Sequence, residues 1–272
     1  MIIDEQDRDR IERLLRNLAA EELLPRFNVV TADLKPDGTL ITAADLAMQR
    51  RLQDALAAGW PGIELLGEEM PADRQRNLLE SAGTALWCLD PLDGTSNFAS
   101  GIPFFAVSLA LLVDGAVQAA WVYDPVRDEC FSALHGAGAQ LNGAALRPRH
   151  SAAHLADAMA IVDLKRLPPA LVSAIAQRAP FRSQRSFGSV ALDWCWIASG
   201  RCQVYLHGGQ KLWDYAAGQL ILRESGAAGG ILSAYDGDWT QRPTLQPRIA
   251  CAAADQALLG EWRDWVGAAL SG

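Results

Sequence analysis

The segment Trp87–Phe98, WCLDPLDGTSNF, constrains this chain more than any other stretch. Two aspartates, Asp90 and Asp93, follow an apolar run and flank Pro91. Because proline cannot donate a hydrogen bond to a sheet, it predicts that the regular strand ends here. Gly94 then permits a tight turn. The pattern therefore predicts a strand that ends by presenting two carboxylates.

Carboxylates at a strand end suit Mg²⁺, which takes a few carboxylates together with water and substrate phosphate. The alternative is an Asp-rich turn that binds nothing. Two further acidic segments favour the metal site. Gly67-Glu68-Glu69 follows the strand-like Ile63–Leu66, and Asp214 stands at the expected start of a helix within Leu212–Gly218, LWDYAAG.

The three blocks GEE, DPLDGT and WDYAAG, in this order, resemble the inositol monophosphatase family of Mg²⁺-dependent, lithium-sensitive phosphatases. Lys35–Asp45, KPDGTLITAAD, matches a fourth block of that family. The resemblance implies an α+β fold, a five-layer αβαβα sandwich of the inositol monophosphatase and sugar phosphatase type. It also implies an N-terminal half, residues 1–145, with most metal ligands and a C-terminal half, residues 146–272, with Asp214 and the substrate-facing segments.

The resemblance assigns metal ligands for two or three Mg²⁺ ions. They are Glu68, Asp90, the backbone carbonyl of Leu92, Asp93 and Asp214. Glu68 would also position the attacking water. For Asp214 a second interpretation stays open, because an aspartate at a helix start is a routine cap.

Catalytic and supporting roles also follow from the resemblance. The hydroxyl of Thr95 would accept a hydrogen bond from the attacking water, and Asp45 would orient Thr95. The local alternative is that Asp45 closes a capping box that begins at Thr42. Lys35 and Glu69 would lie next to the metal ligands without binding the metal themselves. The alternative is that both are ordinary surface residues.

Substrate contacts are expected from several segments. The N–H groups of Gly94 and Thr95 would cradle phosphate oxygens, whereas Ser189, Val190 and His207 would face the leaving group. Inositol-specific relatives carry a glutamate at the position of His207, so this residue leaves the substrate open. The expected reaction is hydrolysis of a small polyol or sugar phosphate, with fructose 1,6-bisphosphate, histidinol phosphate and 3′-phosphoadenosine 5′-phosphate as alternatives.

Composition narrows the protein class. The net charge of −8 argues against nucleic-acid binding, and no apolar run reaches the 18 residues of a membrane span. Five cysteines without metal-ligand spacing are typical of free thiols in the cytoplasm. The family resemblance implies a homodimer. A different class of function, a regulatory protein-binding partner that retains the fold, also stays open.

Hydrophobic periodicity predicts the element order. Helices are expected over 4–24, from 42 to 58, from 168, over 189–199, after 213 and up to about 270. Strands are expected over 63–66, 85–89, 104–113, 116–123, 129–134, 159–163, 182–187, 203–206, 230–232 and 248–252. Residues 31–40 and 136–143 are predicted as turn regions, and Asp114-Gly115 as a hairpin turn.

Overall fold

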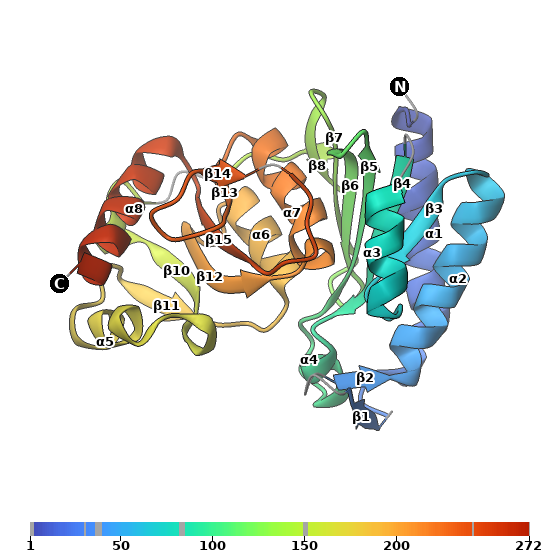
Figure 1. Ribbon diagram of the computed structural model, residues 1–272, viewed down its shortest axis with the longest axis horizontal. Coiled ribbons are helices and arrows are strands. Elements are labelled where there is room, and N and C mark those ends of the chain that lie inside the picture. The colour runs from blue at the N-terminus through green and yellow to red at the C-terminus, as the bar shows by residue number, and fades with distance from the viewer. Residues whose placement is uncertain are drawn as a thin grey trace.

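Two large β-sheets and three layers of helices make up the body of the molecule, and a small two-stranded sheet lies beside them (Figure 1). The computed structural model describes residues 3–29, 31–35, 40–81, 85–148, 152–240 and 242–271. Within these residues, no helix is both long and apolar enough to cross a membrane. The order of layers is helix, sheet, helix, sheet, helix, which confirms the predicted αβαβα sandwich.

The first sheet has seven strands in chain order, and only its first pair is parallel. Its central strands are buried on both faces. Along β4, Trp87 and Leu89 face one hydrophobic cluster, while Leu86 and Cys88 face another. This alternation follows from the two-residue period of a strand. The strands are β3 (Glu64–Gly67), β4 (Ala85–Asp93), β5 (Ala106–Val113), β6 (Ala116–Asp124), β7 (Glu129–Leu134), β8 (Gly138–Leu141) and β9 (Ala144–Ala145).

Helices α1 (Glu5–Glu22) and α2 (Ala43–Gly59) cover the outer face of this sheet. Each begins with a capping box, from Asp4 in α1 and from Thr42 in α2. Such a box satisfies backbone N–H groups that the first turn leaves without a partner. The Thr42 box places Asp45 in the first turn of α2, with its carboxylate buried.

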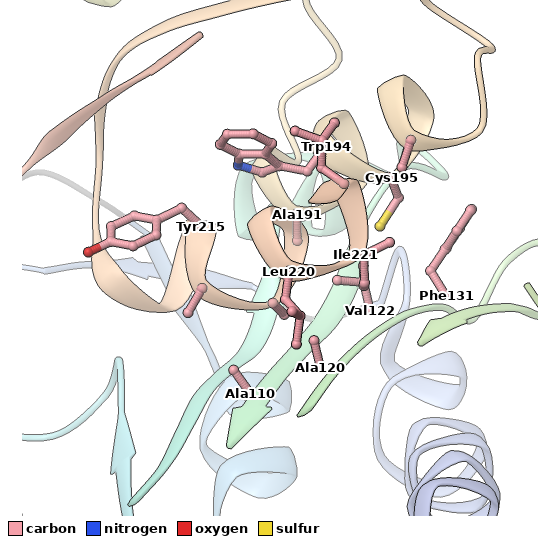
Figure 2. Close-up of a cluster of buried hydrophobic side chains, with 14 of the residues drawn as sticks. Ala110, Ala120, Val122, Phe131, Ala191, Trp194, Cys195, Tyr215, Leu220 and Ile221 are labelled. Atoms are coloured by element: carbon pink, nitrogen blue, oxygen red, sulfur yellow. The ribbon is translucent and has the colours of Figure 1, made fainter. Parts of the chain in front are cut away.

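Helices α6 (Val190–Ala198) and α7 (Leu212–Ser225) form the middle layer between the sheets. Figure 2 shows Leu220 and Ile221 of α7 near Ala110, Ala120 and Val122 of the first sheet, and Trp194 of α6 farther from that sheet, where it packs against α7. Gly218 of α7 permits this packing, because a Cβ there would lie 2.5 Å from the Cβ of Trp194.

The second sheet has the order β11-β10-β12-β15-β13-β14, and β10 pairs in parallel with both β11 and β12. Its outer face is covered by α5 (Pro169–Arg178) and α8 (Gln256–Ser271). The strands are β10 (Met159–Asp163), β11 (Ser183–Arg185), β12 (Val204–Gln210), β13 (Ala228–Leu232), β14 (Trp239–Thr240) and β15 (Arg248–Ala253).

Several local expectations were wrong. Strand β4 continues through Pro91 to Asp93, because a shift in register between Asp90 and Asp93 absorbs the proline. Strand β8 lies within the turn region expected over 136–143. A helix, α3 (Ala72–Ser81), stands in the polar stretch after Glu68, where none was expected. Further elements outside the prediction are 3₁₀ helices η1 (Leu24–Arg26), η2 (Leu155–Asp157) and η3 (Leu164–Arg166).

A short hairpin of β1 (Ala32–Leu34) and β2 (Leu40–Thr42) occupies the connection expected as a turn over 31–40. Residues 36–39 of that turn lie outside the described residues. The last strand of the first sheet ends at Ala145 and the first strand of the second begins at Met159. The division into halves at residues 145 and 146 stays a prediction.

Candidate active site

A cavity of about 670 Å³ opens between the two sheets. One wall comes from the end of β4 and the short helix α4 (Thr95–Ala99). The other comes from the ends of β10 and β12 and from the starts of α6 and α7. Four of its acidic lining residues were predicted from the sequence as metal ligands: Glu68, Asp90, Asp93 and Asp214.

These four carboxylates repel one another. Burial raises the pKa of Asp90 well above its usual range, and the charges of Glu68, Asp93 and Asp214 raise it further. Burial likewise raises the pKa of Asp214 well above its usual range, and Asp93 and Glu68 add to it. Like charges without a cation between them disfavour ionisation. Ionisation of all four side chains therefore requires compensating positive charge beside them.

Asp93 connects the first sheet to the middle layer. Its Oδ2 accepts hydrogen bonds from the Ser189 hydroxyl at 2.5 Å and from the N–H of Ala191 at 2.7 Å, at the start of α6. Burial raises the pKa of Asp93 to about 6, even though these bonds act to lower it. Because Oδ2 accepts hydrogen bonds at the start of α6, Oδ1 is the oxygen that remains available to a ligand in the cavity.

Asp214 combines the two roles that the sequence left open. One oxygen, Oδ2, accepts the N–H of Lys211 at 2.8 Å and so caps α7. The side chain also lines the cavity. Asp90 is arranged in the same way, since its Oδ1 accepts the N–H of Leu92 at 3.0 Å. In both residues the local bond fixes the carboxylate and leaves a second oxygen for a ligand.

Lys35 supplies the cation nearest to this cluster. Its Nζ lies 2.8 Å from Glu68 Oε1 and 2.6 Å from Glu69 Oε1. Burial acts to lower the pKa of Lys35, but the two glutamates together raise it, so the ammonium stays charged. Burial raises the pKa of Glu69 to about 7, although Lys35 acts to lower it.

The donor set suits hard divalent cations. Carboxylate and carbonyl oxygens are the ligands that Mg²⁺ and Ca²⁺ prefer. As placed, no three acidic, histidine or cysteine side chains of the described residues form a ready metal-binding group. The fit therefore rests on the chemistry of the donors, which gather around one cavity and whose pKa values are raised by burial and by one another's charge.

Thr95 lies beside its predicted partner Asp45 and also beside the carbonyl of Leu92. Its Oγ1 is 3.0 Å from Asp45 Oδ1 and 3.0 Å from the backbone oxygen of Leu92. The preceding Gly94 has φ of +96°, and a Cβ there would lie 3.1 Å from the carbonyl oxygen of Phe104. Asp45 also closes its capping box through Thr42, so it performs the local role while facing Thr95.

His207 and Asp163 meet at the opposite wall. They are direct neighbours in the register of the parallel strands β10 and β12, and His207 Nε2 lies 3.2 Å from Asp163 Oδ2. The N–H of Gly209 donates to His207 Nδ1 at 3.2 Å. Burial lowers the pKa of His207, although Asp163 acts to raise it. The ring is therefore neutral, with its proton on Nε2.

Comparison with known proteins shows the family to which this chain belongs. Residues 7–266 match the model of the inositol monophosphatase family. The chain belongs to the inositol monophosphatase family. A curated relative, the Nus factor SuhB of Pasteurella multocida strain Pm70, is 34% identical over 236 residues, which is 84% of either chain.

Solved structures of this family have the same fold. The Thermotoga maritima IMPase TM1415 aligns with a TM-score of 0.80 and 25% identity, over 98% of this chain and 97% of that one. SaIMPase-II with bound inositol monophosphate aligns with a TM-score of 0.78 and 24% identity, over 97% and 96%. An IMPase/NADP phosphatase complexed with Mg²⁺ and phosphate gives 0.77 and 23%, over 94% and 95%.

Sequence reasoning missed part of the cavity wall. Asp163, Lys165, Arg166 and Asp193 line it, and none of them was singled out. Asp163 could have been found, because it ends one predicted strand just as His207 ends another. Ligands bind at the carboxyl ends of parallel strands. Asp193 gave no such signal, since an acidic residue within an apolar helix has many interpretations.

Proposed function

We propose that this protein is a Mg²⁺-dependent phosphomonoesterase that hydrolyses a small polyol or sugar phosphate. One observation carries the proposal. Four carboxylates with too little compensating charge surround a cavity whose edge holds the Thr95–Asp45 pair. Family membership supports the same reaction class. A phosphomonoester dianion could approach such a cluster only if cations were bound there.

Glu68, Asp90, the carbonyl of Leu92, Asp93 and Asp214 would hold two or three Mg²⁺ ions. When bound, such ions lower the pKa of water and stabilise charge on the leaving oxygen. The protein contributes fixed positions for the ligands. Asp93 is held by α6 and Asp214 by the start of α7, so the site depends on both walls of the cavity.

Thr95 and Asp45 would orient the attacking water. The Thr95 hydroxyl carries one hydrogen, which it donates to Asp45 Oδ1, and its lone pairs then accept a hydrogen bond from the water. Burial raises the pKa of Asp45, although the bonds from Thr42 and Thr95 act to lower it. Glu68 would accept a hydrogen bond from the second hydrogen of that water. Lys35 and Glu69 would adjust the charge at Glu68.

The phosphate would lie at Gly94 and Thr95, where the chain turns into α4. Val190 and His207, which line the cavity, would border the leaving group. Ser189 was expected beside them, but it is fully buried and would act through its hydrogen bond to Asp93. Inositol 1-phosphate is the first substrate to test, because the family matches and a solved relative binds inositol monophosphate. Fructose 1,6-bisphosphate, histidinol phosphate and 3′-phosphoadenosine 5′-phosphate are the alternatives.

The test is phosphate release from these four compounds, each with Mg²⁺ and with a chelator. We expect strong release from at least one compound, and only with Mg²⁺. Release that continues after chelation would contradict the metal site. No release from any of the four, while Mg²⁺ still binds, would contradict the proposed substrate range.

A second function is favoured by the curated relatives, which carry the name Nus factor SuhB at 33–34% identity. A regulatory role through a protein partner would use the fold without turnover. Asp93→Asn separates the two functions. The substitution should abolish phosphate release, whereas binding to a partner should persist. Loss of both together would mean that the substitution disrupts the fold.

The remaining expectations concern the cellular location, the oligomeric state and the lithium sensitivity of the protein. All five cysteines are buried and form no disulfide, which supports a cytoplasmic location. Homodimer formation and lithium sensitivity follow from the family resemblance. Sedimentation and inhibition by LiCl test them directly.

A further inference from the structure

The wall of the cavity formed by the ends of β10 and β12 carries a second built site, centred on Asp163. Its side chain remains 18% exposed, and it lines the cavity. Three groups of the protein hold it. Oδ2 accepts Arg166 Nη1 at 2.5 Å and lies 3.2 Å from His207 Nε2, while Oδ1 accepts the N–H of Lys165 at 3.1 Å.

The side chain of His207 is nearly buried, with only 2% of the residue exposed. Nδ1 accepts a hydrogen bond from Gly209, and Nε2 lies 3.2 Å from Asp163 Oδ2. Nε2 makes no well-directed hydrogen bond within the described residues, so Asp163 Oδ2 is the polar group that faces it. The geometry of His207 is that of a residue that positions Asp163.

The backbone beneath Asp163 is fixed by close packing. A Cβ on Gly208 would lie 1.8 Å from the carbonyl oxygen of Arg166, so only glycine lets β12 approach η3 this closely. Burial acts to raise the pKa of Asp163, but His207 and Arg166 lower it well below its usual range. The carboxylate is therefore ionised and accepts hydrogen bonds only.

A second carboxyl group lies between Asp163 and the metal-ligand cluster. Asp193 is 5% exposed and lines the cavity, and its Oδ1 has no hydrogen-bond partner within the described residues. The charges of both Asp93 and Asp163 act on it. A buried polar atom without a partner is costly, and a ligand that bonds to it removes that cost.

We propose that Asp163 accepts hydrogen bonds from hydroxyl groups on the leaving group of the substrate, and that His207 is its positioning residue. Asp193 completes this hydroxyl-binding wall. The inference rests on the proposed phosphatase function and deepens it. The substrate class is a phosphorylated polyol or sugar with free hydroxyls near the ester, rather than an aryl phosphate or a compound recognised mainly through a second phosphate.

The test compares inositol 1-phosphate with phenyl phosphate, which has no hydroxyl group, in wild type and Asp163→Asn. We expect kcat/KM for inositol 1-phosphate to fall at least ten times more than kcat/KM for phenyl phosphate, chiefly through KM. Asp163→Ser serves as a second variant if the first does not fold. Asp114→Asn, the same change in the distant β5–β6 hairpin, is the matched control and should alter neither value.

The positioning role of His207 requires a measurement that would not change if the residue were purely structural. His207→Phe removes both nitrogens and should shift the substrate preference in the same direction as Asp163→Asn. His207→Gln keeps a donor toward Asp163 and should restore most of the preference. If His207→Phe and His207→Gln change the substrate preference equally, the positioning role of His207 is overturned.

Other outcomes are decisive as well. An equal loss with both substrates in Asp163→Asn would overturn the proposal, and so would no loss. A gain with fructose 1,6-bisphosphate, with inositol 1-phosphate unchanged, would show that Lys165 and Arg166 bind an anion instead. If wild type hydrolyses neither of these two compounds, inositol 1-phosphate is excluded as its substrate, whereas the phosphatase function fails only if none of the four compounds named above is hydrolysed. Calorimetric titration with inositol 1-phosphate and Ca²⁺ then decides on Asp163, because unchanged affinity in Asp163→Asn would overturn its role and weakened affinity would support it.

Discussion

Ser189 donates a 2.5 Å hydrogen bond to Asp93 and thereby joins the start of α6 to the end of β4. The two residues are 96 positions apart in the chain, and Asp93 lines the cavity whereas Ser189 is fully buried behind its lining. The bond holds one oxygen of Asp93 away from the cavity, so the other is available to a cation. The orientation of a metal ligand and the contact between the sheet and the middle layer are therefore coupled.

Ser189→Ala tests this coupling. The variant leaves a buried carboxylate oxygen with one donor fewer, which should cost about 1–3 kcal/mol in the free energy of unfolding. Mg²⁺ affinity should fall as well, because Asp93 becomes free to rotate. Denaturant unfolding and Mg²⁺ titration measure the two effects. Ser233→Ala, at an exposed position, is the control. Unchanged Mg²⁺ affinity in Ser189→Ala would contradict the coupling.

Thr95 tests the catalytic pair. Thr95→Ala removes the hydroxyl that lies 3.0 Å from Asp45 and should lower kcat by roughly 10²–10⁴-fold, the usual range for a positioned proton-transfer group. Mg²⁺ binding should persist, since no proposed ligand side chain changes. Thr95→Ser keeps the hydroxyl and should retain most activity. If Ala and Ser variants are equally active, the hydroxyl has no role in catalysis.

The stability of the metal-free protein should depend on pH in an unusual direction. Asp93 has a pKa of about 6 in the folded protein, above its value in the unfolded chain, and Asp90 and Asp214 are raised as well. Between the two pKa values the folded state binds more protons than the unfolded state. The free energy of unfolding therefore decreases as pH rises from about 4 to 6.

Saturating Mg²⁺ should remove this decrease, because a bound cation favours the ionised carboxylates. Melting temperatures across that range, with a chelator and with Mg²⁺, measure both slopes. A chelated protein that becomes more stable over the same pH interval would show that the carboxylates do not repel one another as described.

Gly208 offers a test of the packing beneath Asp163. A methyl group there would lie 1.8 Å from the carbonyl oxygen of Arg166, so η3 must move. Overpacking of this kind typically costs about 1–3 kcal/mol. Gly208→Ala should therefore be destabilised. Gly260→Ala, in α8 with open space around it, should gain roughly 0.5–1 kcal/mol, since glycine is unfavourable within a helix. Equal unfolding free energies for the two variants would contradict this account.

The apolar periodicity of the sequence predicted most of the order of helices and strands, whereas the order of layers followed from the family resemblance. Trp87 and Leu89 alternate with Leu86 and Cys88, and the hairpin turn at Asp114-Gly115 adopts the positive φ angles that its residues favour. Pro91 misled the prediction, since a change of register lets the strand continue past a residue that cannot donate. Such a change depends on the neighbouring strand β5.

The candidate site was predictable where local motifs present side chains and unpredictable where distant strands meet. Asp90, Asp93 and Asp214 lie in short motifs, and the structure places all three at one cavity. The contact of His207 with Asp163 arises only from the pairing of β10 with β12. No local pattern showed that the histidine would lie beside a second carboxylate at the cavity.

The most direct test of the central claim is Mg²⁺-dependent phosphate release from inositol 1-phosphate by wild type and by Asp90→Asn, with Asp114→Asn as control. Asp90 interacts electrostatically with the three other carboxylates of the cluster. We predict saturable activation by Mg²⁺ in wild type and control, and a loss of at least roughly 10²-fold in Asp90→Asn, on the scale of a lost catalytic group. Release that is independent of Mg²⁺, or that persists undiminished in Asp90→Asn, would contradict the account.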